Sequence, residues 1–297
     1  MSYIKAGVDA QGNEVNLFYQ DWGTGSGDAR PTAVLIHGWP LSHEMWDYQM
    51  TELPEHGIRV VAYDRRGFGK SSKPWDGYDY DTLADDLKAV LDELNLQNVT
   101  LIGFSMGGGE VARYMSRHGG ARVSRVAFVS AVTPYLLKTD DNPDGVDQDV
   151  FDEILTNIKK DRADFLQTFA KQFYGVNLVS HPVSQAHLEG DFIRAYLASP
   201  KATIECAKAF SMTDFRQDLT QINVPTLIIH GDDDKTVPIE ASGERTADAL
   251  PNAHYIVYSG APHGLFYTER DRLTKDLLAF VQESVTTGHT AGMSTGY

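Results

Sequence analysis

The sequence predicts an α/β fold in which a mostly parallel central sheet is flanked by helices. Short, continuous apolar runs recur along its 297 residues, for example at 33–36, 60–63 and 126–129. Runs without polar–apolar alternation are typical of strands buried on both faces, and such strands are usually parallel. Between the runs, apolar residues at three- and four-residue spacing predict amphipathic helices. The alternation of the two patterns predicts a doubly wound sheet with helices on both faces.

The individual elements can be placed in order. The first 22 residues predict two strands around a turn at 9–13, because Val15, Leu17 and Tyr19 alternate with polar neighbours. Further strands are predicted at 33–36, 60–63, 99–102, 126–129, 226–229 and 253–258, and helices directly after Ser105, over 83–94 and over 273–281.

Residues 134–218 break this rhythm. They contain no clear parallel strand but carry the aromatic stripe Phe165, Phe169 and Phe173. We interpret 134–218 as a helical cap inserted into a core made of residues 1–133 and 219–285. Residues 286–297 are rich in Gly, Thr and Ser and poor in apolar side chains, which predicts a flexible tail.

Composition excludes several classes of protein. The net charge of −15 argues against binding to nucleic acid or to an anionic membrane. No run of about 18 apolar residues is present to span a membrane, and the first residues lack the apolar core of a signal peptide. Cys206 is the single cysteine, so no internal disulfide can form, and we interpret it as buried filler. These observations predict a cytoplasmic protein.

The segment Gly103-Phe104-Ser105-Met106-Gly107 follows a predicted strand and precedes a predicted helix. Small residues two positions before and after a serine, at such a junction, form the nucleophile elbow pattern. The tight turn projects the serine hydroxyl from the edge of the sheet. It also places the backbone N–H of Met106 at a helix N-terminus, where it can stabilise an oxyanion.

A serine nucleophile needs a base and a carboxylate that orients the base. His263 follows the strand at 253–258, and three adjacent aspartates, Asp232, Asp233 and Asp234, follow the strand at 226–229. Both positions lie beyond carboxyl ends of strands, where open α/β sheets bind ligands. On chemistry alone, any of the three aspartates could be the carboxylate that orients His263. Asp234 is favoured by its distance from Gly231 and Pro238, whereas its two neighbours resemble solvated turn residues.

An oxyanion hole needs a second N–H donor. Trp39 follows the strand at 33–36, at the position where such a donor is expected, and would act together with Met106. The adjacent His37 is interpreted as a brace for this loop and not as the base. The substrate pocket is expected to include Pro40, Phe104, Phe169 and Val237.

Metal chemistry is not predicted. Asp140, Asn142, Asp144 and Gly145 match the first half of a calcium-binding loop, but the twelfth position is Phe151, where a glutamate is required. This segment is therefore interpreted as a solvated acidic loop. The sequence contains no H-E-x-x-H motif and no Cys/His cluster, so we expect no metal and no cofactor.

Five stretches of the sequence together resemble the α/β-hydrolase superfamily across nearly the whole chain. More narrowly, they resemble the cofactor-free bacterial haloperoxidase, aryl esterase and perhydrolase group. The stretches are His37–Pro40 with Trp46, Tyr63–Ser71, Gly103–Glu110, Gly231–Asp234 with Val237–Glu240, and Gly260–Gly264.

The resemblance implies an α/β-hydrolase fold and a catalytic triad of Ser105, Asp234 and His263, with Trp39 and Met106 as oxyanion donors. It implies a carboxylesterase or aryl esterase that works through an acyl-enzyme, and a perhydrolase or haloperoxidase activity through peracids. A proline beside the oxyanion tryptophan, as at Pro40, is associated in this group with peracid formation. Small esters, carboxylic acids and hydrogen peroxide would be its substrates, and a homo-oligomer is expected.

Two alternatives remain at this point. The same triad could cleave lactams or amides, as some members of the group do. The fold could also serve as a ligand receptor that keeps the pocket without turnover. The intact set of Ser105, Asp234 and His263 favours an enzyme.

Overall fold

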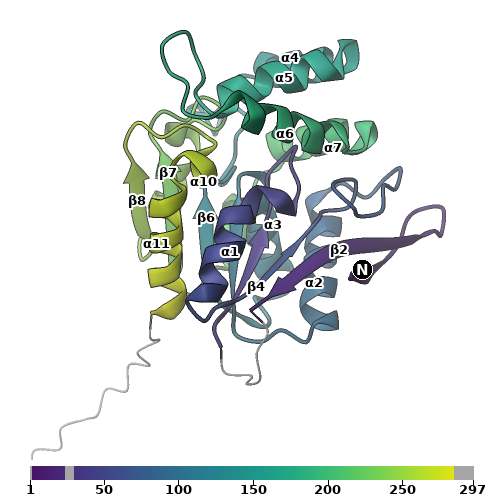
Figure 1. The fold of residues 1–297 in the computed structure, drawn as a ribbon, viewed down its shortest axis with the longest axis vertical. Helices are drawn as coiled ribbons and strands as arrows, with labels where there is room; N and C mark the ends of the chain where they lie inside the picture. The colour runs from purple at the N-terminus through teal and green to yellow at the C-terminus, as the bar shows by residue number, and fades with distance from the viewer. Residues whose placement is uncertain (1, 24–29, 284–297) are drawn as a thin grey trace, which may run out of the picture.

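The computed structural model, which describes residues 2–23 and 30–283, contains an eight-stranded sheet in the order β1-β2-β4-β3-β5-β6-β7-β8 (Figure 1). The strands are β1 (Tyr3–Val8), β2 (Glu14–Trp22), β3 (Thr32–Ile36), β4 (Arg59–Tyr63), β5 (Val99–Phe104), β6 (Val123–Val129), β7 (Thr226–Gly231) and β8 (His254–Tyr258). The predicted α/β-hydrolase fold is confirmed. Every strand predicted from an apolar run is present.

The sheet is mostly parallel. Only the hairpin β1–β2 and the pairing of β2 with β4 are antiparallel among the described strands. Strands β4, β3, β5, β6, β7 and β8 are parallel, and Ile36 of β3 pairs with both Tyr63 of β4 and Gly103 of β5. This register brings the carboxyl ends of the central strands to one edge of the sheet.

Helices cover both faces of the sheet. In Figure 1, α1 (Asp47–Glu55) and α11 (Arg270–Gln282) lie in front of the sheet, and α2 (Tyr80–Glu93) and α3 (Met106–Arg117) lie behind it. Strand β5 is buried along its whole length, and its side chains enter both apolar layers: Leu101 packs on the α2 and α3 side, and Ile102 and Phe104 on the other. The absence of alternation in these strands reflects this burial on two sides.

Four long helices lie between β6 and β7 in the chain. They are α4 (Gln148–Lys160), α5 (Arg162–Phe173), α6 (Gln185–Tyr196) and α7 (Pro200–Met212). They gather above the carboxyl ends of β6 and β7 in Figure 1, and the short helix α8 (Arg216–Leu219) follows them. The exact division into core and cap remains an interpretation, and the predicted tail at 286–297 lies outside the described residues.

The remaining elements follow β7 and β8, apart from one short turn after β3. They are the 3₁₀ turns η1 (His43–Trp46) and η2 (Ile239–Ala241), and helices α9 (Gly243–Ala249) and α10 (Leu265–Thr268). Within residues 2–23 and 30–283, none of the helices has the length and apolar character needed to cross a bilayer.

Glycines allow α3 to pack directly on the sheet. A Cβ atom at Gly103 would lie 2.5 Å from the carbonyl oxygen of Gly107, and one at Gly107 would lie 2.6 Å from the carbonyl oxygen of Ile36. Both obstacles are backbone atoms and cannot move aside as a side chain would. The two small residues of the elbow are therefore required by the approach of the helix to β3 and β5.

We predict that Gly107→Ala lowers the free energy of unfolding by about 1–3 kcal/mol, because an added methyl group overpacks this contact. Gly190→Ala in α6 is the matched control. Its Cβ would meet only the end of the Arg194 side chain, at 3.3 Å, and removing a helical glycine gains about 1 kcal/mol. Urea unfolding followed by tryptophan fluorescence measures both. Equal stability of the two variants would contradict the argument.

Candidate active site

Ser105, His263 and Asp234 meet at the carboxyl edge of the sheet. The Nε2 atom of His263 lies 3.0 Å from Ser105 Oγ, and its Nδ1 atom lies 2.6 Å from Asp234 Oδ2. All three side chains are buried. They come from loops after β5, β8 and β7, so residues 158 and 29 positions apart in the chain are joined by two hydrogen bonds. The structure brings together the three residues that sequence reasoning selected.

Ser105 sits in a strained turn. Its backbone adopts φ 53° and ψ −118°. This is a region of positive φ that residues other than glycine rarely occupy. Its N–H donates to the carbonyl of Val129 at 2.9 Å, and its own carbonyl accepts from Gly108 at 3.0 Å. These bonds to β6 and α3 hold the turn, so the hydroxyl is presented at the N-terminus of α3.

Asp234 is held on both carboxylate oxygens. Its Oδ1 atom accepts the backbone N–H groups of Thr236 and Val237 at 2.9 and 2.8 Å, and Oδ2 faces His263. Burial alone would raise its pKa, but the charge of His263 and the hydrogen bond from His230 hold the pKa of Asp234 well below its usual range. A carboxylate in this setting stays ionised beside the imidazole.

The neighbouring aspartates do not face His263. Asp232 and Asp233 are exposed; Asp232 accepts a hydrogen bond from the Gly260 N–H, and Asp233 pairs with Lys235 at 2.9 Å. The ambiguity between the three carboxylates is therefore resolved in favour of Asp234 as the partner of the imidazole.

Two backbone N–H groups are candidates for an oxyanion hole. Met106 follows Ser105 in the chain, and Trp39 lines the same cavity as Ser105. The N–H groups of Trp39 and Met106 donate no hydrogen bond within the described part of the chain. The loop of Trp39 also packs against the elbow. The approach is so close that a Cβ atom added at Gly38 would lie 3.1 Å from Ser105 Cβ. The indole of Trp39 donates to the Thr203 carbonyl of α7 at 3.0 Å, which ties this loop to the helices above.

His37 braces the Trp39 loop. Its Nε2 atom accepts the N–H of Arg65 at 2.9 Å, and its Nδ1 atom lies 2.9 Å from the Gly38 carbonyl. Burial, and next the charge of Arg65, lower the pKa of His37 to about 3. Arg65 in turn forms a buried ion pair with Glu110 of α3. Both ring nitrogens of His37 are thus engaged in contacts that hold the loop, so His37 is not a candidate for the base.

A cavity of about 80 Å³ opens onto Ser105 and His263. Its walls are mostly apolar and come from the loops of the sheet edge and from α4, α5 and α7. The lining residues are Trp39, Ser105, Val132, Leu136, Val146, Val150, Phe151, Ile154, Phe169, Phe210, Lys235, Thr236, Val237, Pro238 and His263. Such a space suits a small apolar acyl group beside the serine.

Comparison with known proteins fits this geometry. The profile of the α/β-hydrolase fold family matches residues 31–270. The chain belongs to this family. Non-heme chloroperoxidase CPO-A1 of Kitasatospora aureofaciens is 41% identical over 91% of this chain and 97% of its own length. The bifunctional esterase/perhydrolase DCH of Acinetobacter calcoaceticus is 43% identical over 90% of this chain and 96% of its own.

A solved structure agrees with these relatives. The crystal structure of a bromoperoxidase from Bacillus anthracis superposes with a TM-score of 0.89 at 46% identity, covering 95% of this chain and 99% of that one. The predicted resemblance to haloperoxidases and esterase/perhydrolases is therefore confirmed at the level of the family.

The expected pocket residues of this α/β hydrolase divide into three groups. Phe169 and Val237 line the cavity at Ser105, and Pro40 lines a smaller neighbouring cavity that also contains Phe169. Phe104 lines neither of these cavities, contrary to the expectation. Its ring is fully buried and packs 4.9 Å from the ring of His263, because β5 directs this side chain toward the α1 and α11 face. Its ring therefore packs against the imidazole of His263 and does not line the cavity.

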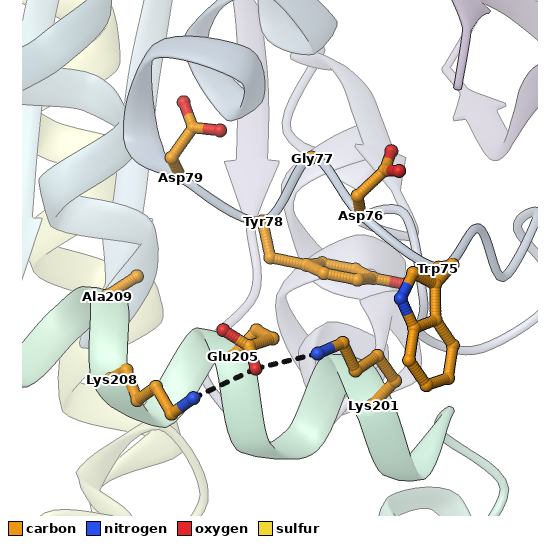
Figure 2. Close-up of a pocket in the computed structure, with 9 residues that line it drawn as sticks. All are labelled: Trp75, Asp76, Gly77, Tyr78, Asp79, Lys201, Glu205, Lys208 and Ala209. Atoms are coloured by element: carbon orange, nitrogen blue, oxygen red, sulfur yellow. Dashed lines mark hydrogen bonds and ion pairs between the residues drawn. The ribbon is translucent and has the colours of Figure 1, made fainter. Parts of the chain in front are cut away.

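A further cavity of about 400 Å³ lies elsewhere (Figure 2). It runs between the loop before α2 and the outer side of α7, and shares no lining residue with the cavity at Ser105. Figure 2 shows Lys201 and Lys208 on either side of Glu205, and both are paired with it, at 2.9 and 3.0 Å. No serine or histidine lines this cavity, so it offers no acyl-transfer chemistry.

The calcium-loop candidate has a structural role instead. Asn142 is buried and donates from its amide to the carbonyls of Tyr135 and Leu137, at 3.0 and 2.7 Å, and Phe151 packs in the apolar core. Among residues 2–23 and 30–283, no group of three or more His, Cys, Asp or Glu side chains is arranged to hold a metal ion.

Sequence reasoning missed two supporting groups. Arg65 and its partner Glu110 lie in motifs that were matched to the family, but their contact joins the loop after β4 to α3 and leaves no local pattern. His230 lies next to the last residue of β7, 3.3 Å from Asp234. It follows the predicted strand at 226–229 and was given no role.

We predict that the Cys206 thiol does not react in the native protein. It is fully buried in α7, and burial raises the pKa of its thiol to about 12, so almost no thiolate exists at neutral pH. Titration with a chromogenic disulfide reagent should detect no thiol in the native state and a single thiol in urea. Fast labelling of the folded protein would contradict this placement.

Proposed function

We propose that this protein is a serine esterase that forms an acyl-enzyme on Ser105 and can pass the acyl group to hydrogen peroxide. The observation that carries the proposal is the chain of contacts from Asp234 through His263 to Ser105, 2.6 and 3.0 Å long, which opens onto an apolar cavity. Nucleophile, base and orienting carboxylate are the groups that acyl transfer requires.

In the first half of the reaction, His263 Nε2 accepts the Ser105 proton as Oγ attacks the carbonyl carbon of the substrate. The negative charge moves to the carbonyl oxygen, where the N–H groups of Trp39 and Met106 stabilise it. Each such donor contributes about 3 kcal/mol to lowering the barrier. Asp234 stabilises the imidazolium, which then protonates the departing alcohol and leaves the acyl ester on Ser105.

In the second half, His263 activates the acceptor that attacks the acyl-enzyme. Water gives the carboxylic acid, and hydrogen peroxide gives the peracid. A peracid transfers an oxygen atom and its proton to a halide ion in solution, so that the peracid becomes the carboxylate and the halide becomes hypohalous acid. This sequence joins the esterase/perhydrolase and chloroperoxidase names of the relatives in a single mechanism.

We predict that Ser105→Ala lowers kcat/KM for p-nitrophenyl acetate by at least about a thousandfold, because it removes the nucleophile. The circular dichroism spectrum of the variant should match the wild type, since the change removes one oxygen atom. A wild-type protein that binds the ester without turnover would instead favour the receptor alternative. Full activity in Ser105→Ala would exclude the acyl-enzyme.

We also predict that halogenation depends on a carboxylate. With peroxide and bromide, the enzyme should brominate monochlorodimedone in acetate buffer but not in phosphate buffer. Acetic acid can acylate Ser105 with water as the leaving group, whereas phosphate supplies no acyl group. Ser105→Ala should show only the rate of the enzyme-free mixture. Bromination by Ser105→Ala in acetate above that rate would show that halide is oxidised by another route.

A further inference from the structure

His230 makes an unexplained contact with the carboxylate of the triad. This residue lies next to the last residue of β7, and its side chain is fully buried. Its Nε2 atom lies 2.9 Å from the carbonyl oxygen of Val237 and 3.3 Å from Oδ2 of Asp234. Both neighbours are acceptors, so the ring carries a proton on Nε2 and shares it between them.

The other side of the ring fixes its position. The Nδ1 atom is buried and has no hydrogen-bond partner among the described residues. Gly243, the first residue of α9, packs against it so closely that a Cβ atom there would lie 2.7 Å from Nδ1. The imidazole is therefore clamped between α9 and the loop at 234–237, with its single donor aimed at the carboxylate and at the loop.

We propose that His230 is a positioning residue for the acyl-transfer reaction. Its Nε2–H fixes the orientation of the Asp234 carboxylate and joins it to Val237, whose side chain lines the cavity at Ser105. The inference rests on the proposed function, because it assigns His230 a role through the proposed triad. It goes beyond that function, since it names a further histidine on which the triad geometry depends.

The contacts of the carboxylate show why this donor matters. Oδ1 is held by two backbone N–H groups, but Oδ2 is shared by only His263 and His230 among the described side chains. The other charged group nearby, Lys235, is exposed and paired with Asp233. Without His230, the carboxylate can rotate away from His263. Its Oδ2 atom also loses a hydrogen-bond donor, so it presents more negative charge to the imidazole of His263.

Two consequences are measurable. A looser carboxylate orients His263 less well, which lowers kcat. More negative charge on Oδ2 favours the protonated imidazole, so a higher pH is needed to free the base. The acid limb of the kcat/KM profile should therefore move to higher pH, an effect that a purely structural residue would not produce.

The experiment compares His230→Leu, His230→Asn and His230→Gln, using p-nitrophenyl acetate. A glutamine amide can reach the place of Nε2, whereas asparagine is too short and leucine has no donor. The initial burst of p-nitrophenol counts functional sites, so kcat is expressed per site and a loss of folded protein does not count. We expect His230→Leu and His230→Asn to lower kcat about tenfold, the effect of one hydrogen bond to a charged group, and His230→Gln to restore most of it.

His43→Leu is the matched control. His43 is also a buried histidine paired with a buried aspartate, Asp64 at 2.6 Å, but it does not line the cavity. It should lower stability and leave kcat and the acid limb unchanged.

Three outcomes would overturn the inference. One is that His230→Leu has the same kcat per site as the wild type and the same acid limb of the kcat/KM profile. Another is a His230→Gln variant no better than His230→Asn, which also decides the matter if the leucine variant does not fold. The third is a shift of the acid limb in His43→Leu equal to that in His230→Leu. Failure of the proposed function is seen separately, as hydrolysis by Ser105→Ala.

Discussion

The turn at Ser105 is the constraint on which the rest of the site depends. A side chain at positive φ costs about 1–3 kcal/mol, and the turn persists only because its surroundings determine it. The N–H of Ser105 is bonded to β6, its carbonyl to α3, and Gly103 and Gly107 let the helix reach the strands. These contacts place the hydroxyl above the sheet edge, where loops from β7 and β8 can meet it.

A buried negative charge is the second requirement. An ionised carboxylate in a dry interior is unfavourable unless hydrogen bonds replace its water. Asp234 receives two backbone N–H groups and two imidazoles, and its pKa is depressed in spite of burial. The backbone donors come from the same loop, so the turn after Gly231 both positions the carboxylate and solvates it. Asp232 and Asp233 lack this arrangement and stay in water.

The parts that could be predicted from sequence are those with a local signal. Continuous apolar runs indicated the strands, and the spacing of small residues around Ser105 indicated the elbow. Phe104 was misplaced because its position beside Ser105 says nothing about the sheet face that it enters, which the register of β5 decides. The contact of Arg65 with Glu110 joins residues 45 positions apart, and no periodicity indicates it. His230 and Asp234 are only four residues apart, but their contact depends on how the chain turns after β7, which the residue pattern does not specify.

Chemistry and substrate fit come from different parts of this chain, yet they are mechanically linked. The proposed triad lies on loops of the sheet edge, whereas α4, α5 and α7 supply much of the cavity wall. The indole of Trp39 bonds to Thr203 of α7 and packs against Phe169 of α5. Because the backbone of the same residue carries the proposed oxyanion donor, a displacement of these helices would move the donor as well as the wall. A change in the acyl group that shifts the helices therefore acts on the rate of acyl transfer, and not only on binding.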